Sequence, residues 1–406
     1  MSLTLQPFQL AVPDEILADL ASRLARTRLP ELPPSTGWPD GCHPAQFSAF
    51  LDYWRTQFDW RAFEARVNRW PQFLTTIDGA EIHFLRIAVP STAQASPGEP
   101  AAPPAIPLLL LHGWPGSFVE FLALAELLAA SEEGVRFELV IPSLPGFGYS
   151  RRAADGPMGL HRTAEIFAQL MRGLEHERFF VQGGDFGAGV GSALALRHPD
   201  AVIGLHLNYI PGSYRPFVAA DAPPTPDENA FLTAVVDWLE RKGAYSHLHR
   251  TRPHALSIGL HDSPAGLAAW ILEKFASWAD CDGHLDRLPR ELLAANLTLY
   301  WVTASLATSI EFYRDVRDHP FHLAPGERIT PPCSIAHFPR EAPVPPRSWV
   351  ERGYNVVRWT DQPRGGHFAA LEAPELLARD IRAFVTSIAP AIPIKPACPL
   401  TAFLAK

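Results

Sequence analysis

Residues 178–194 read RFFVQGGDFGAGVGSAL, a pattern from which the architecture of the chain can be worked out. An apolar run ends in two glycines, an aspartate follows at position 185, and small residues recur along the next two turns. A strand that turns sharply into a helix produces this pattern, because its close packing excludes large side chains. Such a turn presents one side chain above a sheet, and here that side chain is Asp185 rather than serine.

Apolar runs and amphipathic segments alternate on either side of this turn. Continuous apolar runs that end near glycine occur at 106–116 and 137–148, and another follows at 202–212. Runs of this kind are typical of strands buried in a parallel sheet. The amphipathic segment 161–174 separates two of them, and two further strand patterns follow near the C-terminus. This alternation predicts an α/β protein.

The chain divides into a leader, a core in two pieces, a helical cap inserted between them and a tail. The predicted ranges are 1–75 for the leader, 76–213 and 326–390 for the core, 214–325 for the cap and 391–406 for the tail. Amphipathic periods at 13–27 and 44–70 make the leader helical, and we expect it to pack on the core. Asp78-Gly79 predicts a hairpin turn, and the Pro-rich stretch 90–105 predicts a surface loop.

Composition excludes several classes of function. The 406 residues carry a formal net charge of −8 without a run of Lys and Arg, which argues against a nucleic-acid partner. Four cysteines lie far apart without metal-ligand spacing, so we expect free thiols, a reducing compartment and a cytoplasmic location. No apolar stretch reaches the roughly 18 residues of a membrane span, so no membrane anchor is expected. The oligomeric state stays open between a monomer and a homodimer.

Several motifs, taken in order, carry a resemblance to a known family. They read FDWRAFEARVNRWPQF, HGWPGSFVEF, PSLPGFGYS, GGDFG, DSPAGLAAWILEKF and GGHFAALEAPELL, and they span about residues 5–386. Together they resemble the microsomal-type epoxide hydrolases of the α/β-hydrolase superfamily, in their soluble microbial branch. The resemblance implies a mostly parallel, eight-stranded sheet with a leader and an inserted cap. It also implies a small-molecule epoxide as substrate and no cofactor.

The aspartate at the turn suits a particular chemistry. Serine that attacks a saturated carbon would leave an ether, whereas a carboxylate leaves an ester that water can hydrolyse. Asp185 could therefore open an epoxide and later release a diol. The alternative is that Asp185 only caps the helix that follows it.

Hydrolysis of such an ester needs a base, and His367 follows the last predicted strand beside a Gly-Gly turn. A carboxylate should orient the imidazole, as in hydrolytic triads. Glu341 follows the penultimate predicted strand and fits both the chain order and the acidic position of the family. Asn208 is not an acid, and Asp361 lies six residues before His367 on the same strand exit.

The resemblance also implies proton donors and an oxyanion site. Tyr245 and Tyr313 match the pair of cap tyrosines that protonate the epoxide oxygen, a need that follows from the poor leaving ability of an alkoxide. The backbone N–H groups of Trp114 and Phe186 match the oxyanion hole, and their side chains should line the pocket. His112 is expected to brace the loop that carries Trp114.

Other functions remain as alternatives. A haloalkane dehalogenase would use the same aspartate, but it would hold halide with N–H donors rather than phenols. A non-catalytic binding protein would have no need of a nucleophile, base and acid. His247, His249 and His254 lack a carboxylate or cysteine at ligand spacing, so no metal is expected. The glycines after Gln182 do not form a dinucleotide fingerprint, so no nicotinamide is expected.

Overall fold

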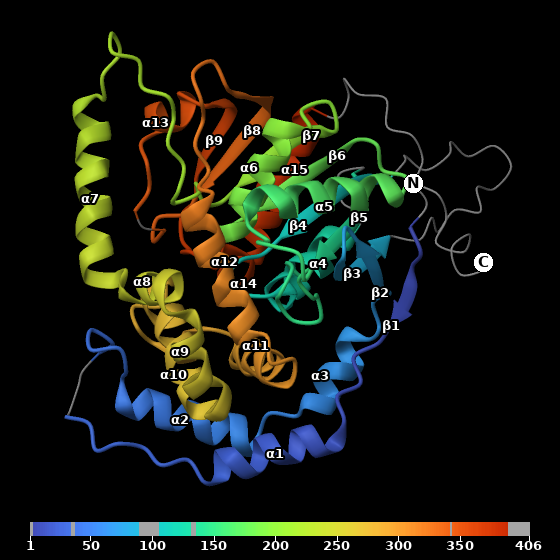
Figure 1. The fold of residues 1–406 in the computed structure, drawn as a ribbon, viewed down its shortest axis with the longest axis vertical. Coiled ribbons are helices and arrows are strands. Elements are labelled where there is room, and N and C mark those ends of the chain that lie inside the picture. Colours follow the sequence, from blue (N-terminus) through green and yellow to red (C-terminus); the bar gives the residue numbers. More distant parts are fainter. Residues whose placement is uncertain (1–2, 34–36, 89–104, 131–134, 342, 389–406) are drawn as a thin grey trace, which may run out of the picture.

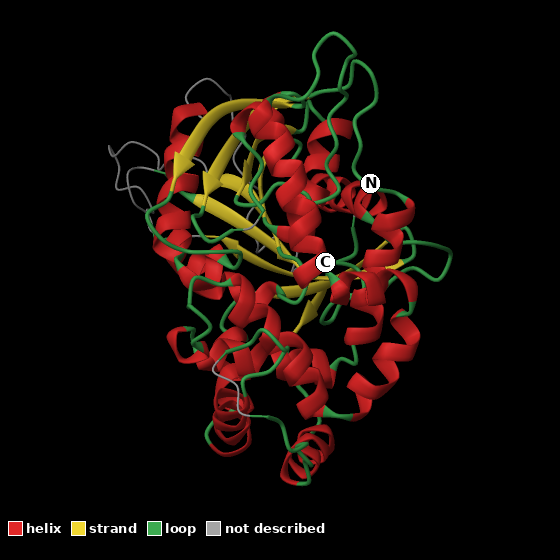
Figure 2. Ribbon diagram, turned by 90° about the vertical axis from the view of Figure 1, so that its left-hand side faces the viewer, coloured by secondary structure: helices red, strands yellow, loops and turns green. Residues whose placement is uncertain are grey.

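The protein is described by a computed structural model that covers residues 3–33, 37–88, 105–130, 135–341 and 343–388. Nine strands form a single sheet in the order β1-β2-β3-β5-β4-β6-β7-β8-β9. Their bounds are β1 Gln6–Phe8, β2 Gln72–Ile77, β3 Ala80–Ala88, β4 Ile106–Leu111, β5 Phe137–Pro142, β6 Phe179–Gly183, β7 Val202–Leu207, β8 Ile329–His337 and β9 Tyr354–Asp361. Figure 2 shows helices on both sides of this sheet and a separate helical region below it.

Six neighbouring strands of the sheet run parallel, in the order β5-β4-β6-β7-β8-β9. At the other edge β1, β2 and β3 pair antiparallel, and β3 pairs antiparallel with β5. The mostly parallel sheet is therefore as expected, but it has nine strands rather than eight. The additional strand is β1, in which Pro7 pairs with Phe73 of β2. An edge strand of three residues is too short to leave a recognisable alternation in the sequence.

The hairpin prediction at Asp78-Gly79 is confirmed. The two residues join β2 to β3 with φ angles of 47° and 77°, and Ile77 pairs with Ala80. Positive φ at both positions matches the right-handed twist of the flanking strands, and glycine tolerates it without steric cost. The predicted loop at 90–105, apart from its last residue, and the predicted tail at 391–406 lie outside the described residues.

Helices cover both faces of the sheet. The core helices are α4 Leu122–Ala129, α5 Leu160–Gly173, α6 Asp185–Arg197, α13 Arg347–Glu351, α14 Ala369–Glu372 and α15 Pro374–Ile388. From β4 the chain crosses to β5 on one side and then to β6 on the other, so right-handed connections place α4 and α5 on opposite faces. α6 packs on α5 and α15 packs on α4. The direction in which successive strands are added to the sheet reverses at β4. Open α/β sheets bind their ligands at such a reversal.

The cap is helical, as the sequence predicts. Its helices are α7 Pro226–Lys242, α8 Ala244–Thr251, α9 Pro253–Asp262, α10 Pro264–Trp278, α11 Arg290–Val302 and α12 Leu306–Asp318. The chain bends by 91° between α11 and α12. Ala304 stands at this bend with a φ of 54°, which ends the first helix. The bend directs α12 back along the core (Figure 1).

The leader also differs from its prediction. Its helices are α1 Asp14–Ala25, α2 Pro44–Thr56 and α3 Trp60–Val67, so the expected single helical segment at 44–70 is broken. The break occurs because the Asp59 side chain accepts a hydrogen bond from the Ala62 N–H and caps a new helix.

The leader was expected to pack on the core, yet its helices lie mainly beneath the cap (Figure 1). The indole of Trp54 donates to Thr298 of α11 at 2.8 Å, and that of Trp38 donates to the carbonyl of Gly283 at 2.9 Å. Arg23 on α1 pairs with Asp262 at the end of α9. Two segments of the range 1–75 join the core sheet, β1 and the first residues of β2, and β1 pairs along the edge of β2.

Two further observations bear on the composition. Cys42, Cys281 and Cys333 are free thiols, and Cys398 lies outside the described residues. In the described part of the chain no single helix has the length and apolar character needed to cross a membrane. The bent pair of α11 and α12 meets that test only when its two members are counted together.

Candidate active site

Asp185 occupies the sharp turn between β6 and α6. Its φ of 47° lies in the left-handed region, an uncommon conformation for a residue with a side chain and one that recurs at functional turns. The helix packs so closely on β4 that a Cβ at Gly187 would lie 2.0 Å from the Leu111 carbonyl oxygen. Asp185 also begins a helix of 13 residues, whose N-terminal dipole favours a carboxylate.

His367 lies between two carboxylates. Its Nε2 is 3.2 Å from Asp185 Oδ2, and its Nδ1 is 2.9 Å and 3.0 Å from the two oxygens of Glu341. Burial alone would lower the pKa of His367, but the charges of Glu341 and Asp185 and their hydrogen bonds raise it well above its usual range. The imidazole is therefore protonated while Asp185 carries its charge.

The other two candidates for the orienting acid lie elsewhere. Asp361 is 2.7 Å from His337 Nδ1, and 77% of its side chain is exposed. Asn208 accepts a hydrogen bond from Gln182 at 2.7 Å. Of the three, the structure brings only Glu341 to His367, and Glu341 is buried.

The loop after β4 supplies an N–H to the nucleophile position. The backbone N–H of Trp114 donates to Asp185 Oδ1 at 2.9 Å, so this oxygen faces away from the one beside His367. His112 accepts from the Leu144 N–H at 3.1 Å through Nε2, and its Nδ1 lies 3.1 Å from the Gly113 carbonyl, which braces the loop. In the described part of the chain the Phe186 N–H donates no hydrogen bond to the Asp185 side chain.

Two cap tyrosines lie over the nucleophile. Tyr245 comes from α8 and Tyr313 from α12, and their ring centroids are 5.7 Å apart and nearly perpendicular. Burial and the charge of Asp185 raise the pKa of Tyr245. Burial, Tyr245 and then Asp185 raise the pKa of Tyr313. Both phenols therefore keep their protons and can donate them in hydrogen bonds.

Aromatic and charged neighbours fix the two tyrosines. Trp114 stacks on Tyr245 with centroids 5.5 Å apart, and Phe186 meets Tyr313 at 4.7 Å. The ammonium of Lys274 lies 4.5 Å from the centroid of the Tyr245 ring, an arrangement that favours a cation over an aromatic face. Of the two side chains expected in the pocket, Phe186 lines the apolar cavity that the tyrosines share, whereas Trp114 is fully buried behind Tyr245 and does not line it.

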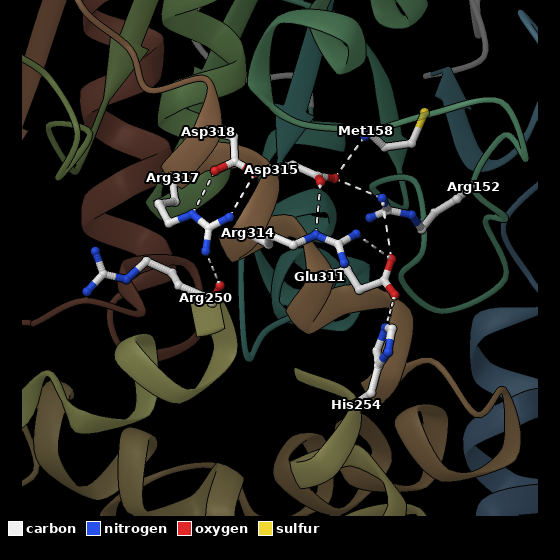
Figure 3. A network of polar contacts seen from close by, with 9 residues as sticks. All are labelled: Arg152, Met158, Arg250, His254, Glu311, Arg314, Asp315, Arg317 and Asp318. Atoms are coloured by element: carbon white, nitrogen blue, oxygen red, sulfur yellow. Dashed lines mark hydrogen bonds and ion pairs between the residues drawn. The ribbon is translucent and has the colours of Figure 1, made fainter. Parts of the chain in front are cut away.

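Polar contacts join α12, the helix that carries Tyr313, to the core and to α9 (Figure 3). Asp315, two residues beyond Tyr313, accepts from the guanidinium of Arg152 at 2.8 Å and from the Met158 N–H at 2.9 Å. Arg152 also reaches Glu311, which pairs with His254 of α9. The network surrounds the turn of α12 that carries the tyrosine.

Two cavities meet at Asp185. One, of about 390 Å³, is lined by apolar residues such as Phe231 and Val316 together with both tyrosines. The other, of about 440 Å³, is lined by His367 and Glu341. Both volumes lie in the range of small-molecule sites. The residues common to the two cavities are Asp185, Tyr209, Trp238 and Tyr245.

Some residues of the site were not found from the sequence. Glu372 accepts the N–H groups of Gly366 and Phe368, which flank His367, and that of Asp280 at the end of the α10 segment. Tyr209 lines both cavities, and its ring lies 5.4 Å from that of His367. The position of Glu372 five residues after His367, on the turn that follows, is the signal that could have found it.

The cap histidines do not converge on one point. His249 accepts from the indole N–H of Trp270 at 3.0 Å, and His254 lies 2.7 Å from Glu311. Within the described ranges, no group of three His, Cys, Asp or Glu side chains has the arrangement of a metal site.

Comparisons with known proteins agree with this geometry. Residues 5–121 match the family model described as the epoxide hydrolase N terminus, and residues 106–245 match that of the alpha/beta hydrolase fold. A candidate epoxide hydrolase of Stigmatella aurantiaca is 38% identical over 93% of this chain and 83% of its own length. Epoxide hydrolase 1 of Oryctolagus cuniculus is 35% identical over 94% of this chain and 89% of its own.

Solved structures extend the likeness to three dimensions. The crystal structure of the juvenile hormone epoxide hydrolase from the silkworm Bombyx mori superposes with a TM-score of 0.81 at 30% identity. It covers 96% of this chain and 95% of that chain. The likeness therefore extends over the leader, the core and the cap together.

Proposed function

This chain belongs to the epoxide hydrolase family and has the α/β-hydrolase fold, and we propose that it converts an epoxide and water into a vicinal diol through an ester on Asp185. One observation carries the proposal. Asp185 and the hydroxyl-bearing side chains of Tyr245 and Tyr313 line the same cavity, so a nucleophile and two proton donors face one bound molecule.

Ring opening is the first step. Asp185 Oδ2 forms a bond to an epoxide carbon, the bond from that carbon to the ring oxygen breaks, and a phenol protonates the departing oxygen. Because burial keeps Tyr245 and Tyr313 protonated, they can act as donors at neutral pH. The tyrosinate is then reprotonated from solvent.

Ester formation prepares the base for the second step. Once Asp185 is an ester, it no longer contributes the charge that raises the pKa of His367. The imidazole then loses its proton more readily and can take one from water. Glu341 keeps the ring oriented through Nδ1 and stabilises the imidazolium when it forms again.

Hydrolysis completes the cycle. The water oxygen bonds to Cγ of Asp185 while its proton passes to His367 Nε2. The resulting oxyanion lies at Oδ1, where the Trp114 N–H donates, and the N–H of Phe186 is the second proposed donor. The bond from Cγ to the alkyl oxygen then breaks, and the diol oxygen takes the proton from His367. The new carboxylic acid of Asp185 passes its proton to His367, which restores the starting carboxylate and imidazolium.

Two variants test this assignment. We expect Asp185→Ala to form no diol, because no other group forms the ester. We expect His367→Gln to react once with an epoxide and then to accumulate the ester, visible by intact-mass analysis as protein plus substrate. Styrene oxide is a suitable probe, and a haloalkane serves as the control substrate. Diol formation by folded Asp185→Ala, or rapid turnover by His367→Gln without adduct, would remove these roles.

The free thiols of Cys42, Cys281 and Cys333 support a further, separate proposal, that the protein works in the cytoplasm. The oligomeric state, monomer or homodimer, can be measured by light scattering.

A further inference from the structure

A third and much smaller cavity lies behind the nucleophile. The centre of a water molecule can occupy about 20 Å³ of this cavity, so it has room for one water. Asp185 is the one residue that lines both this cavity and the apolar cavity of the tyrosines. His367 lines it as well, whereas neither Tyr245 nor Tyr313 does. The small cavity therefore meets the carboxyl of Asp185 away from the bound epoxide.

Glu120 brings a second carboxyl to this cavity. It belongs to the 3₁₀ turn Phe118–Phe121, which follows the loop that carries Trp114. The carboxyl lies against Gly116, where a Cβ would be only 2.3 Å from Glu120 Oε2. No hydrogen bond to either carboxyl oxygen of Glu120 is formed by the residues described in the structure. A carboxyl in such a place is satisfied by water.

The charges around the cavity suit a bound water. Burial raises the pKa of Glu120, the charge of His367 lowers it and the charge of Asp185 raises it, and together they bring this pKa to about 8. The three groups therefore interact electrostatically. At neutral pH the protonated Glu120 both donates and accepts hydrogen bonds. A water held by Glu120 would keep one hydrogen for His367 Nε2 and a lone pair for the carbonyl carbon of the ester.

We propose that Glu120 holds the water that hydrolyses the ester, in the small cavity between its own carboxyl and His367. This inference rests on the proposed function, because it concerns the second half of that reaction. In this step the water oxygen bonds to Cγ of Asp185 and its proton passes to His367. Glu120 gains and loses no proton overall and contributes orientation.

The assignment predicts a loss confined to one half-reaction. In Glu120→Leu, which keeps the approximate volume but removes both oxygens, ester formation should stay within about threefold of the parent. Hydrolysis of the ester should slow by about 100-fold, the usual effect of misplacing a reactant by about 1 Å. Because the ester accumulates, kcat and KM should fall together. Glu120→Gln, which retains hydrogen bonding, should recover most of the hydrolysis rate.

The experiment separates the two rates with styrene oxide by rapid mixing, using tryptophan fluorescence and intact mass of quenched samples. Glu126→Gln, a matched change at an exposed glutamate of neighbouring α4, is the control and should leave both rates unchanged. If Glu120→Leu does not fold, Glu120→Asp, which withdraws the carboxyl by one methylene, takes its place and should also slow hydrolysis selectively.

Three outcomes would overturn the inference. They are an unchanged hydrolysis rate in folded Glu120→Leu or Glu120→Asp, an equal loss in both half-reactions, and a glutamine variant as slow as the leucine variant. Adduct accumulation in His367→Gln distinguishes these from failure of the proposed function. If that variant accumulates ester while Glu120→Leu turns over normally, the ester mechanism stands and only the role of Glu120 is wrong.

Discussion

At the scale of single residues, the site depends on how each oxygen of Asp185 is occupied. Oδ1 accepts the Trp114 N–H at 2.9 Å, and Oδ2 lies 3.2 Å from His367 Nε2. In the proposed mechanism the first oxygen becomes the oxyanion and the second attacks the epoxide carbon. A backbone φ of 47° at Asp185 makes this double engagement possible.

The tyrosine pair leads to a prediction for ring opening. Tyr245→Phe and Tyr313→Phe should each slow ester formation by roughly 100- to 1000-fold, because each removes a hydrogen bond to developing negative charge. The remaining phenol reduces that loss, and the double variant should be almost inactive. Rapid-mixing fluorescence measures the step, since buried Trp114 stacks on Tyr245.

Tyr149→Phe is the matched control for the tyrosines. Its buried hydroxyl has no hydrogen-bond partner in the described part of the chain, so its removal should change neither rate. Parent-like ester formation in both single variants and in the double variant would assign the pair a structural role and would direct attention to haloalkanes as substrates.

Residues with a local sequence signal were the ones that could be predicted. Asp185 and His367 each stand beside glycines at a strand exit, and Glu341 follows the strand before. Glu120 has no such signal, and Glu372 has only its position five residues after His367, because their roles depend on which backbone groups and cavities the completed fold brings to them.

At the scale of elements, the bend between α11 and α12 decides where Tyr313 lies. A periodicity argument detects both helices but not the left-handed Ala304 that ends the first one. By contrast, α15 has plain local signals, since Pro374 starts it and a continuous amphipathic period runs along it. A helix break inside an apolar segment is therefore the feature that hydrophobic periodicity does not predict.

The anchor of α12 gives a prediction at this scale. Asp315→Asn weakens the buried pair with Arg152, so the turn that carries Tyr313 should lose its fixed position. We expect ester formation to slow by about tenfold with hydrolysis unchanged, and stability to fall by on the order of 3 kcal/mol. Rapid mixing and urea denaturation measure the two effects.

Asp318→Asn makes the same change on the same helix at an exposed pair with Arg317, and it should alter stability by less than about 1 kcal/mol. If both variants behave alike, or if Asp315→Asn slows both half-reactions equally, the network does not act through Tyr313.

At the scale of the whole molecule, buried histidines and buried carboxyls have opposite effects on stability in acid. Burial lowers the pKa of His83 and of His249 to about 3 and that of His112 to about 4. Between pH 6.5 and 5.5 the unfolded chain takes up protons at these positions and the folded chain does not, so each histidine removes about 1 kcal/mol of stability as pH falls. Burial raises the pKa of Glu120 to about 8 and that of Glu372 to about 7, so each of these carboxyls adds about 1 kcal/mol of stability over the same interval. The effect of one histidine is therefore measured as a difference between a variant and the parent protein.

Urea denaturation of the parent protein and of His83→Gln at pH 6.5 and 5.5 measures this difference. Relative to the parent, the change in unfolding free energy on acidification should be more favourable by about 1 kcal/mol in His83→Gln, whatever the substitution does to absolute stability. The same change in both proteins would contradict the prediction.

The leader beneath the cap bears on how molecules reach Asp185. Hydrogen bonds from Trp38 and Trp54, and the ion pair of Arg23, fasten the lower side of the cap to the N-terminal helices. These contacts oppose a hinge movement that would lift the cap from the core. We expect substrate and product to pass through the two large cavities instead. Exposed Arg340 lines one of these cavities, and exposed Leu239 lines the other. The width of an epoxide would then decide whether it can enter the cavity. This selection would act before the epoxide contacts Asp185.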